Sequence, residues 1–256
     1  MAAITPAQDL FDLTGEVALV TGASSGLGAR FAEVLAAHGA KVIAAARRVD
    51  RLVELAASSP NIVPLELDVT DTASFEAALD QAEQRTGPLT LLVNNAGVAN
   101  DERFIDTSPG EWRRVMDTNV DSIWHLSQTF AKRLIAAKRP GTIVNIASEA
   151  GFAVCGVPAA YAVSKAAVVQ MTKAMALDLA RHRIRVNAIA PGFIWSEMTT
   201  EYLQSGAGQD NIKRIPQRRA GDPSDLDGIL LLLASVKASG FMTGSTVLAD
   251  GGELLA

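Results

Sequence analysis

The 256-residue sequence predicts an α/β fold in which helices cover both faces of a parallel sheet. Short runs rich in apolar and β-branched residues alternate with longer segments of helical pattern. The short runs are apolar almost throughout, as expected for strands that are buried on both faces. Repeated strand–helix units favour right-handed crossovers and a doubly wound sheet. No long linker interrupts the pattern, so we expect one domain over residues 1–256.

Seven strands are expected, at Val17–Thr21, Lys41–Ala46, Ile62–Leu67, Leu89–Asn94, Gly141–Ala147, Arg185–Ala190 and Thr246–Ala249. Six helices are expected, near Gly26–His38, Arg48–Ala57, Asp71–Arg85, Pro109–Ala137, Pro158–Arg181 and Pro223–Val236. Ser108, Pro109 and Glu111 have the spacing of a capping box with proline at the first helical position. Asp222 is a similar cap before Pro223, and Gly39 is placed to end the first helix.

Composition and charge exclude several classes of partner and compartment. The formal net charge of −5 argues against nucleic acid or an anionic membrane as partner. The single cysteine, Cys155, cannot form an internal disulfide and fits a reducing compartment. The first fourteen residues lack the pattern of a signal peptide, and the longest apolar run, Ile229–Ala234, is far too short to span a bilayer. We therefore expect a cytoplasmic protein.

A glycine-rich turn follows the first expected strand and opens the first helix. Its sequence is Thr-Gly-Ala-Ser-Ser-Gly-Leu-Gly over residues 21–28. Glycines let the backbone turn tightly and approach a pyrophosphate, while a helix N-terminus offers free N–H groups and a positive dipole end. The strand–turn–helix context therefore predicts a dinucleotide site. Its residues are Gly22, Ser24, Ser25, Gly26, Leu27 and Gly28.

The residues after the second and third strands bear on which dinucleotide is bound. Such folds usually carry an acidic residue about 20 residues after the turn, where it binds the ribose hydroxyls. Here Arg47 and Arg48 follow the second strand instead, and two guanidiniums favour the 2′-phosphate of NADP(H) over NAD(H). The alternative is that both arginines are solvated residues of the next helix. Asp68, with Val69, is expected either to reach the adenine edge or only to cap a helix.

Three polar residues point to proton transfer. Tyr161 and Lys165 are four residues apart in a helical segment, so both lie on one face, and Ser148 ends an apolar strand upstream. A free tyrosine has a pKa of about 10, and a nearby ammonium stabilises the phenolate and lowers that pKa. Tyrosine can then act as a general acid or base. Taken alone, the spacing also describes an ordinary helix with a half-buried tyrosine.

Together these motifs resemble the short-chain dehydrogenases/reductases in their single-domain form, over essentially the whole chain. The matching positions are Thr21-Gly-x-x-x-Gly-x-Gly28, Asp68-Val69, Asn94–Gly97, Asn119, Ser148, Tyr161-x-x-x-Lys165, Pro191-Gly192, Thr243-Gly244 and Asp250–Gly252. The resemblance implies a Rossmann-type domain with a seven-stranded parallel sheet, a nicotinamide cofactor and reversible carbonyl/alcohol chemistry. It also implies a homotetramer or a dimer.

The resemblance implies a role for each matching position. Tyr161 is the proton donor to a carbonyl or the acceptor from an alcohol, and Lys165 holds the nicotinamide ribose and lowers the pKa of Tyr161. Ser148 hydrogen-bonds the substrate oxygen, and Asn119 holds a water that links Lys165 to solvent. Further cofactor contacts are implied at Asn95, Ala96, Gly97, Pro191, Gly192 and Ile194.

The remaining expectations concern the substrate. An irregular, partly apolar segment at residues 193–221, with a mobile core at Ser205–Gly208, is expected to form a lid. Cys155 is expected to be an apolar filler and Glu149 to point to solvent. The three histidines, His38, His125 and His182, lack metal-ligand spacing, so no metal is expected. A ketone or aldehyde with an apolar or aromatic body is predicted from Phe152, Val154, Val157, Trp195, Met198 and Tyr202.

Other functions remain open at this point. The main alternative is a reductase of 3-oxoacyl thioesters carried by acyl-carrier protein or coenzyme A. That function needs a basic patch beside the pocket, for which the candidates are Arg113, Arg114, Lys132 and Arg133. A steroid or sugar dehydrogenase is also open. A non-catalytic NADP(H)-binding regulator is the alternative of another class, but such a protein has no need of the proton donor Tyr161.

Overall fold

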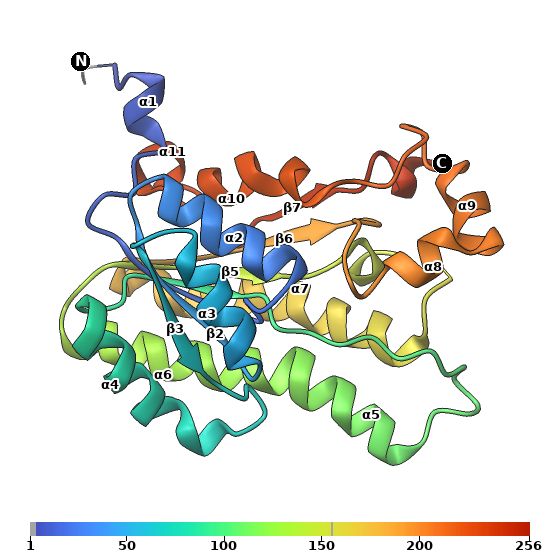
Figure 1. The fold of residues 1–256 in the computed structure, drawn as a ribbon, viewed down its shortest axis with the longest axis horizontal. Coiled ribbons are helices and arrows are strands. Elements are labelled where there is room, and N and C mark those ends of the chain that lie inside the picture. Colours follow the sequence, from blue (N-terminus) through green and yellow to red (C-terminus); the bar gives the residue numbers. More distant parts are fainter. Residues whose placement is uncertain (1–3, 155) are drawn as a thin grey trace.

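Seven strands form the sheet at the centre of the protein (Figure 1). A computed structural model describes residues 4–154 and 156–256. The strands are β1 (Val17–Thr21), β2 (Lys41–Ala46), β3 (Ile62–Glu66), β4 (Leu91–Asn94), β5 (Gly141–Ile146), β6 (Ile184–Pro191) and β7 (Thr246–Ala249). They lie in the order β3-β2-β1-β4-β5-β6-β7, and every pairing is parallel. The predicted doubly wound α/β fold is therefore confirmed.

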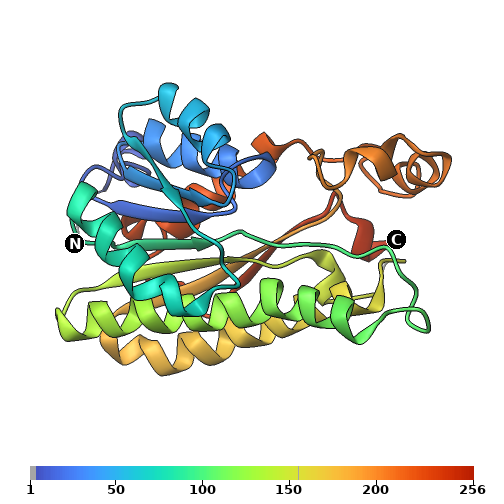
Figure 2. The same ribbon diagram turned by 60° about the horizontal axis from the view of Figure 1, so that its bottom comes forward.

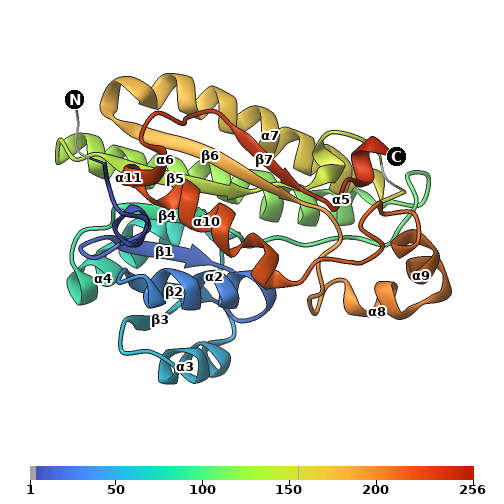
Figure 3. The ribbon, with the colours of Figure 1, turned by 90° about the horizontal axis from the view of Figure 1, so that it is seen from above.

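Helices cover both faces of the sheet (Figures 2 and 3). One face carries α2 (Gly26–Ala37), α3 (Val49–Ala57) and α10 (Asp227–Ala234), and the other carries α4 (Phe75–Thr86), α5 (Pro109–Met116), α6 (Ser122–Ala136) and α7 (Ala159–Leu179). The short helices α1 (Ala7–Leu10) and α11 (Val236–Ser239) lie side by side, and α8 (Thr200–Gln204) and α9 (Gly206–Ile212) extend beyond the carboxyl ends of the strands. Among the described residues, none of the helices combines the length and the apolarity needed to cross a bilayer.

Alternate residues of the strands pack into two cores, one on each face of the sheet. In β1, Leu19 packs with Phe130 in the core beneath α4, α6 and α7. Its neighbours Ala18 and Val20 pack with Phe31 in the core beneath α2 and α10. Side chains alternate between the faces along a strand, so two covered faces require a run that is apolar throughout.

The predicted helix Pro109–Ala137 is helical up to Ala136 but is not α-helical throughout. A π-helical stretch of five residues, Asp117–Asp121, joins α5 to α6. Such stretches are rare in proteins overall, but many of those that occur lie at functional sites. The start of α5 also differs from the prediction: Ser108 Oγ accepts from the Glu111 N–H at 3.1 Å, but the Glu111 carboxylate pairs with Arg114. Only half of the predicted capping box is therefore present.

Two other expected elements are shorter than predicted. The segment Pro223–Val236 is a 3₁₀ turn followed by α10, and Ser235 then leaves the helix in extended backbone. Ser235 caps the separate helix α11, because its Oγ accepts from the Ala238 N–H at 3.2 Å. Strand β4 begins two residues later than expected, since the Leu89 N–H donates to the Glu83 side chain of α4 instead of to a strand.

The strand order reverses between β1 and β4, which places the glycine-rich turn beside the loop after β4. Thr21 Oγ1 accepts from the N–H groups of Asn95 and Ala96 at 3.0 and 3.1 Å. Asn95 Nδ2 donates in return to the Thr21 carbonyl oxygen at 2.9 Å. Open α/β sheets bind their ligands at the carboxyl ends of the strands, at such a switch point. The topology therefore locates the candidate site here.

Candidate active site

A cleft of about 500 Å³ opens at the carboxyl ends of the central strands. Its wall is formed by the loops after β1 to β6, the start of α7 and part of the 193–221 segment. The predicted residues that line it are Gly22, Ser24, Ser25, Gly26, Leu27, Arg47, Arg48, Asp68, Val69, Asn95, Ala96, Gly97, Ser148, Tyr161, Lys165, Pro191, Gly192 and Ile194. Gly28 and Asn119 are buried behind this wall.

The glycine-rich turn leaves no room for side chains at two positions. Gly22 has a φ of +66°, and a Cβ there would lie 2.9 Å from Ala96 Cα. A Cβ on Gly28 would lie 2.3 Å from the Gly22 carbonyl oxygen, so Gly28 lets α2 pack against the turn. Ser25, the N-cap of α2, makes no side-chain bond to the helix and does not compete for its first N–H groups. The turn therefore fits a pyrophosphate.

Arg48 closes one end of the cleft, which we call the arginine end. Its guanidinium donates to Ser24 Oγ at 3.0 and 3.1 Å and to Ser25 Oγ at 2.7 Å. Arg47 is more exposed, and its Nη1 lies 4.0 Å from Asp68 Oδ2. Both arginines line the cleft, so neither is simply a solvated helix residue. Two cations lie where a ribose-binding carboxylate is usual.

Asp68 braces the turn after β3 and does not cap a helix, since the N-cap of the next helical turn is Asp71; a contact with adenine stays a prediction. Its Oδ1 accepts from the Thr70 N–H at 2.9 Å and from the Thr70 hydroxyl at 2.8 Å. These bonds, led by the one from the backbone, hold the pKa of Asp68 below its ordinary value. The residue thus fixes the turn after β3 and also lines the cleft.

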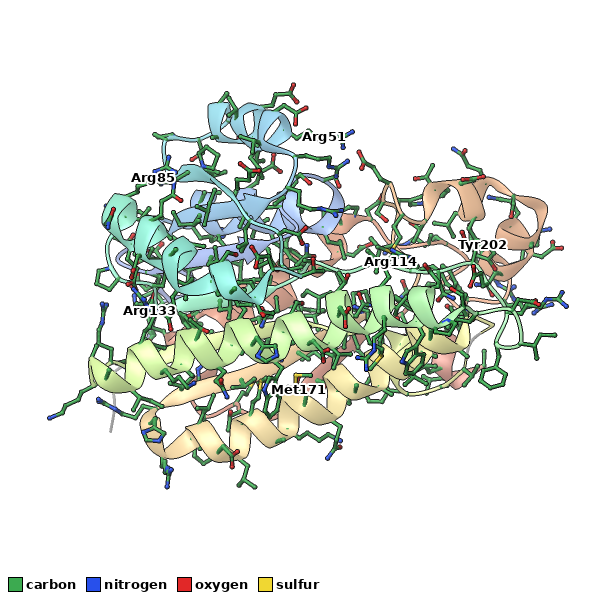
Figure 4. The ribbon with its side chains drawn as sticks, turned by 90° about the horizontal axis from the view of Figure 1, so that it is seen from below. Arg51, Arg85, Arg114, Arg133, Met171 and Tyr202 are labelled. Carbon is green, nitrogen blue, oxygen red and sulfur yellow. The ribbon has the colours of Figure 1, made fainter. Side chains whose placement is uncertain are left out.

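Two charged residues at the arginine end are not expected from the sequence. Glu197, in the 193–221 segment, pairs with Arg51 of α3 and accepts from Arg48 Nη1 at 3.2 Å. Arg51 lies at the edge of α3 that faces α8 (Figure 4). These bonds, led by that from Arg51, lower the pKa of Glu197. The helical spacing of Arg51 from Arg48 was an available signal, whereas Glu197 is 146 and 149 positions from its partners.

Tyr161, Lys165 and Ser148 lie together at the other end of the cleft, which we call the tyrosine end. Lys165 Nζ is 5.6 Å from the centroid of the Tyr161 ring, one turn away on α7. The Ser148 hydroxyl acts on the Tyr161 phenol, whose pKa it lowers. Lys165 is buried, and its ammonium donates to the Ile146 carbonyl oxygen at 2.9 Å. A phenol, a hydroxyl and an ammonium therefore surround one small volume.

The pKa of Tyr161 moves in the direction opposite to the expected one. Burial raises it, the bond with Ser148 lowers it, and the charge of Glu149 raises it further. Burial also lowers the pKa of Lys165 to about 8. The expected lowering by Lys165 is thus wrong for this arrangement, because desolvation acts on both groups and the ammonium faces the ring and the Ile146 carbonyl.

Asn119 is fully buried in the π-helical stretch. Its Oδ1 accepts from the Val98 N–H at 2.8 Å, and its Nδ2 donates to the Val98 carbonyl oxygen at 2.9 Å and to Ser164 Oγ at 3.0 Å. A Cβ on Gly97 would lie 3.4 Å from Asn119 Oδ1 and 3.6 Å from Lys165 Nζ. The side chain therefore positions the loop after β4 beside Lys165, and a water relay through Asn119 stays a prediction.

Glu149 is 3% exposed, so the expectation that it points to solvent is wrong. Its carboxyl is hydrogen-bonded to Glu253. Burial, together with the charges of Glu253 and Asp250, raises the pKa of Glu149 to about 8. No local feature of the sequence indicates this pairing, because Glu253 and Asp250 come from the far end of the chain. Among residues 4–154 and 156–256, these carboxyls included, no group of three or more potential ligands could hold a metal ion.

The apolar residues expected around the substrate are only partly at the cleft. Met198 lines it, whereas Phe152 and Val154 are 50% and 80% exposed. Tyr202 of α8 stacks on Phe193 with 5.4 Å between the ring centroids. Cys155 lies outside the described residues.

The Ser205–Gly208 stretch, expected to be mobile, forms the start of helix α9. Ser205 Oγ caps the helix by accepting from the Gly208 N–H at 3.1 Å. A Cβ on Gly208 would lie 2.0 Å from the Tyr202 carbonyl oxygen, so the two short helices are closely packed. The physical reason is the serine cap, a local signal that the glycine content of the stretch had concealed.

The four basic residues considered for a carrier-protein patch are spread along α5 and α6. Arg114 lines the cleft and pairs with Glu111, but Arg133 lies far from it and pairs with three carboxylates of α4 (Figure 4). Arg113 lies 3.8 Å from Asp117, and Lys132 donates to a glutamine of its own helix. These residues therefore do not form one basic patch beside the cleft.

The fold and the cleft are those of a dinucleotide-binding α/β protein, with Tyr161, Ser148 and Lys165 at one end of the cleft. The short chain dehydrogenase family matches residues 16–206. The 3-oxoacyl-(acyl-carrier-protein) reductase of Thermotoga maritima is 38% identical over 249 residues, covering 95% of this chain and 99% of that protein. The 5-keto-D-gluconate 5-reductase of Escherichia coli strain K12 is 36% identical over 253 residues, covering 97% and 99%. The chain belongs to the short-chain dehydrogenase family.

Solved structures agree with this assignment over almost the whole chain. A gluconate 5-dehydrogenase from Burkholderia cenocepacia, crystallised with NADP and tartrate, has a TM-score of 0.93 and 34% identity, covering 98% of this chain and 100% of that chain. A short-chain dehydrogenase/reductase from Mycobacterium marinum has a TM-score of 0.92 and 38% identity, covering 97% and 99%. The family resemblance carried by the sequence motifs is thus confirmed.

Proposed function

We propose that the protein is an oxidoreductase that transfers a hydride between NADP(H) and a carbonyl or secondary alcohol substrate with an apolar or aromatic body. One observation carries the proposal: a single cleft joins an arginine end to Tyr161, Ser148 and Lys165, of which Ser148 and Lys165 are buried and Tyr161 is half-buried. One site thus contains positive charge that can bind a phosphate and a proton donor that can serve a carbonyl.

The chain offers a suitable group for each part of the cofactor. The glycine-rich turn and the start of α2 would hold the pyrophosphate, because a Cβ at Gly22 or Gly28 has no space there. Arg48, assisted by Arg47, would hold the 2′-phosphate, and Lys165 the nicotinamide ribose. The related gluconate 5-dehydrogenase crystallised with NADP supports NADP(H) over NAD(H). When bound, NADPH supplies the hydride, which is the chemistry of the cofactor itself.

The residues of the tyrosine end would orient the substrate and move its proton. Ser148 would bond the carbonyl oxygen and direct it toward the Tyr161 hydroxyl, which gives up its proton. The raised pKa of Tyr161 keeps the phenol protonated at neutral pH, which suits it as an acid. In the oxidation direction the phenolate is the base, so oxidation is expected to become faster as the pH rises. The form of Tyr161 present at neutral pH is therefore the acid that reduction needs.

The 193–221 segment is proposed as a lid, and a homotetramer or dimer in the cytoplasm as the working assembly. Glu197 and Met198 of this segment line the cleft, which supports the lid. Trp124 on α6 and Leu177 on α7 are 47% and 80% exposed, which supports contacts between subunits on these helices. Light scattering coupled to size exclusion tests the assembly, and a monomer would refute it.

A reductase of 3-oxoacyl thioesters is the second candidate, because a relative with that name is 38% identical. A panel assay separates the candidates: oxidation of NADPH and, in parallel, NADH is followed with ketones, aldehydes, 5-keto-D-gluconate and a 3-oxoacyl thioester. We expect turnover with NADPH to be at least about tenfold more efficient than with NADH, as for a loss of about 1.4 kcal/mol of phosphate binding. Cofactor binding without turnover on any of these substrates would favour the regulator.

A further inference from the structure

The ends of three neighbouring strands meet around the carboxyl of Glu149. Glu149 directly follows Ser148 at the end of β5, and Gly192 follows β6. A Cβ on Gly192 would lie 2.8 Å from Glu149 Oε2 and 2.7 Å from the Cα of Asp250, which follows β7. The Glu149 carboxyl is thus enclosed by backbone on two sides, and among the described residues no donor reaches its Oε2 or the buried Oε2 of Glu253.

The groups that face Glu149 are acidic. Glu253 is hydrogen-bonded to it, Asp250 acts on it through its charge, and Glu149 itself acts on Tyr161 in the same way. Asp250 is already satisfied as an anion, because its two oxygens accept from the N–H groups of Gly252 and Leu254 at 2.9 and 3.0 Å. A hydrogen bond between two carboxyl groups needs one proton, since two carboxylates have only acceptors. This bond therefore requires that one of the two carboxyls, Glu149 or Glu253, carries a proton.

Glu253 also reaches the 193–221 segment. Its Oε1 accepts from Asn211 Nδ2 of α9 at 3.4 Å. The end of the segment rests on the same C-terminal turn, because the Gln217 N–H donates to the Gly251 carbonyl oxygen at 3.2 Å. A Cβ on Gly251 would lie 2.8 Å from an Ile215 side-chain carbon, which shows how close this packing is. The C-terminal turn thus lies between Glu149 and the segment.

We propose that Glu149 is a positioning residue: through a proton shared with Glu253 it ties the C-terminal turn, and with it α9, to the turn that carries Ser148. The inference rests on the proposed function only where it counts Ser148 as catalytic. Loss of the proton places two carboxylates in contact inside a buried space, so the bond is replaced by repulsion. The C-terminal turn and α9 then separate from the Ser148 turn.

Limited digestion with trypsin tests this tie without any substrate. Arg214 and Arg218 are exposed in the 193–221 segment and report on its opening. Glu149→Gln is the informative variant, because its amide donates to the Glu253 carboxylate at every pH. With a pKa of about 8, the Glu149 carboxyl is about one-tenth ionised at pH 7 and about nine-tenths ionised at pH 9. We expect equal cleavage of wild type and variant at pH 7, and about tenfold faster cleavage of wild type at pH 9.

Three further variants complete the design. Glu253→Gln keeps a donor on the other side of the bond and is expected to be protected at pH 9 as well. Glu149→Ala has no donor and is expected to be cleaved rapidly at both pH values. Glu201→Gln, an exposed carboxyl in α8, is the matched control and is expected to behave as wild type. Equal cleavage of wild type and Glu149→Gln at pH 9, or protection of Glu149→Ala at pH 7, would overturn the proposal.

Kinetics in the oxidation direction give a second readout. In this direction kcat/KM rises with pH as Tyr161 loses its proton. Ionisation of Glu149 separates the C-terminal turn from the Ser148 turn, so kcat/KM should fall again above about pH 8. We expect the fall in wild type and its absence in Glu149→Gln. If digestion follows the expected pattern but no substrate is turned over, the proposed function fails and the tie stands. If turnover is found but wild type and Glu149→Gln have the same pH profile, the tie fails and the proposed function stands.

Discussion

The two ends of the cleft use charge in opposite ways. At the arginine end, the Arg48 and Glu197 side chains are 45% and 56% exposed, and their pairing lowers the pKa of the carboxylate. At the tyrosine end, burial lowers the pKa of Lys165 and raises those of Glu149 and Tyr161. Every shift at the first end favours the charged form, and every shift at the second favours the neutral form. One end is suited to bind an anion, the other to hold and transfer protons.

The largest effect is expected from removing the hydroxyl of Tyr161, which donates the proton at the tyrosine end. Tyr161→Phe should lower kcat by about 10²- to 10⁴-fold, the range associated with general acid–base catalysis. The Kd for NADPH, measured by fluorescence titration, should change less than about twofold, because the arginine end is intact. Tyr202→Phe, which keeps the stacking ring on Phe193, is the control. A loss of NADPH binding in Tyr161→Phe would break the division between the two ends.

A second test concerns the cost of burying the Lys165 ammonium. Its pKa falls from 10.5 to about 8 on folding, so the unfolded chain binds more protons between these values and the stability of wild type rises with pH there. Lys165→Met should therefore be more stable than wild type, with the largest difference in the free energy of unfolding below pH 8. This difference should be smaller by about 3 kcal/mol at pH 10.5. Urea unfolding across this range measures it. Lys173→Met, on the exposed side of α7, should show no such trend.

A smaller effect is expected at the arginine end. Arg48→Gln removes the guanidinium that bonds to Ser24 and Ser25. The Kd for NADPH should rise about tenfold and that for NADH should stay unchanged, because a charge-assisted bond at an exposed site contributes about 1.5 kcal/mol. Arg47→Gln should have a weaker effect, since that side chain is 75% exposed. If Arg48→Gln raises the Kd for NADPH and the Kd for NADH equally, Arg48 does not bind the 2′-phosphate.

The smallest effect, of opposite sign, is expected from Glu197→Gln. Glu197 neutralises Arg48 and Arg51, so its removal should lower the Kd for NADPH by about two- to fivefold. Exposed ion pairs contribute about 0.2–1 kcal/mol and are screened by salt, so the difference should shrink at high ionic strength. Glu201→Gln is the matched control on the neighbouring helix. An equal change in the Kd for NADH would contradict the mechanism.

The sequence predicted local features well and distant contacts poorly. Strands β1, β2 and β7 have their predicted bounds, and the glycine-rich turn lies where it was expected. Apolar periodicity and turn chemistry depend on neighbours in the sequence, so both can be read from the chain itself. Glu149 and Glu197 depend on partners brought close only by folding, and the sequence contains no signal for either pairing.

The prediction that the pKa of Tyr161 is lowered was wrong for a related reason. The spacing of Tyr161 and Lys165 on one helix face was read correctly, and the charge of Lys165 was taken as the dominant influence. Burial is the larger influence on both groups. A sequence gives the order of charges along a helix, but the depth at which the helix is buried depends on the whole fold.

The π-helical stretch between α5 and α6 makes the length of this part of the chain critical. Its hydrogen bonds span one residue more than those of an α-helix. Deleting one residue from Asp117–Asp121 would let a regular α-helix run from Pro109 onward: the side chains of α6 would keep their faces, whereas those within the stretch itself would shift. The amide at Asn119 would then leave Val98. Among relatives of this protein, insertions and deletions should therefore be absent from this helix even where its surface residues vary freely.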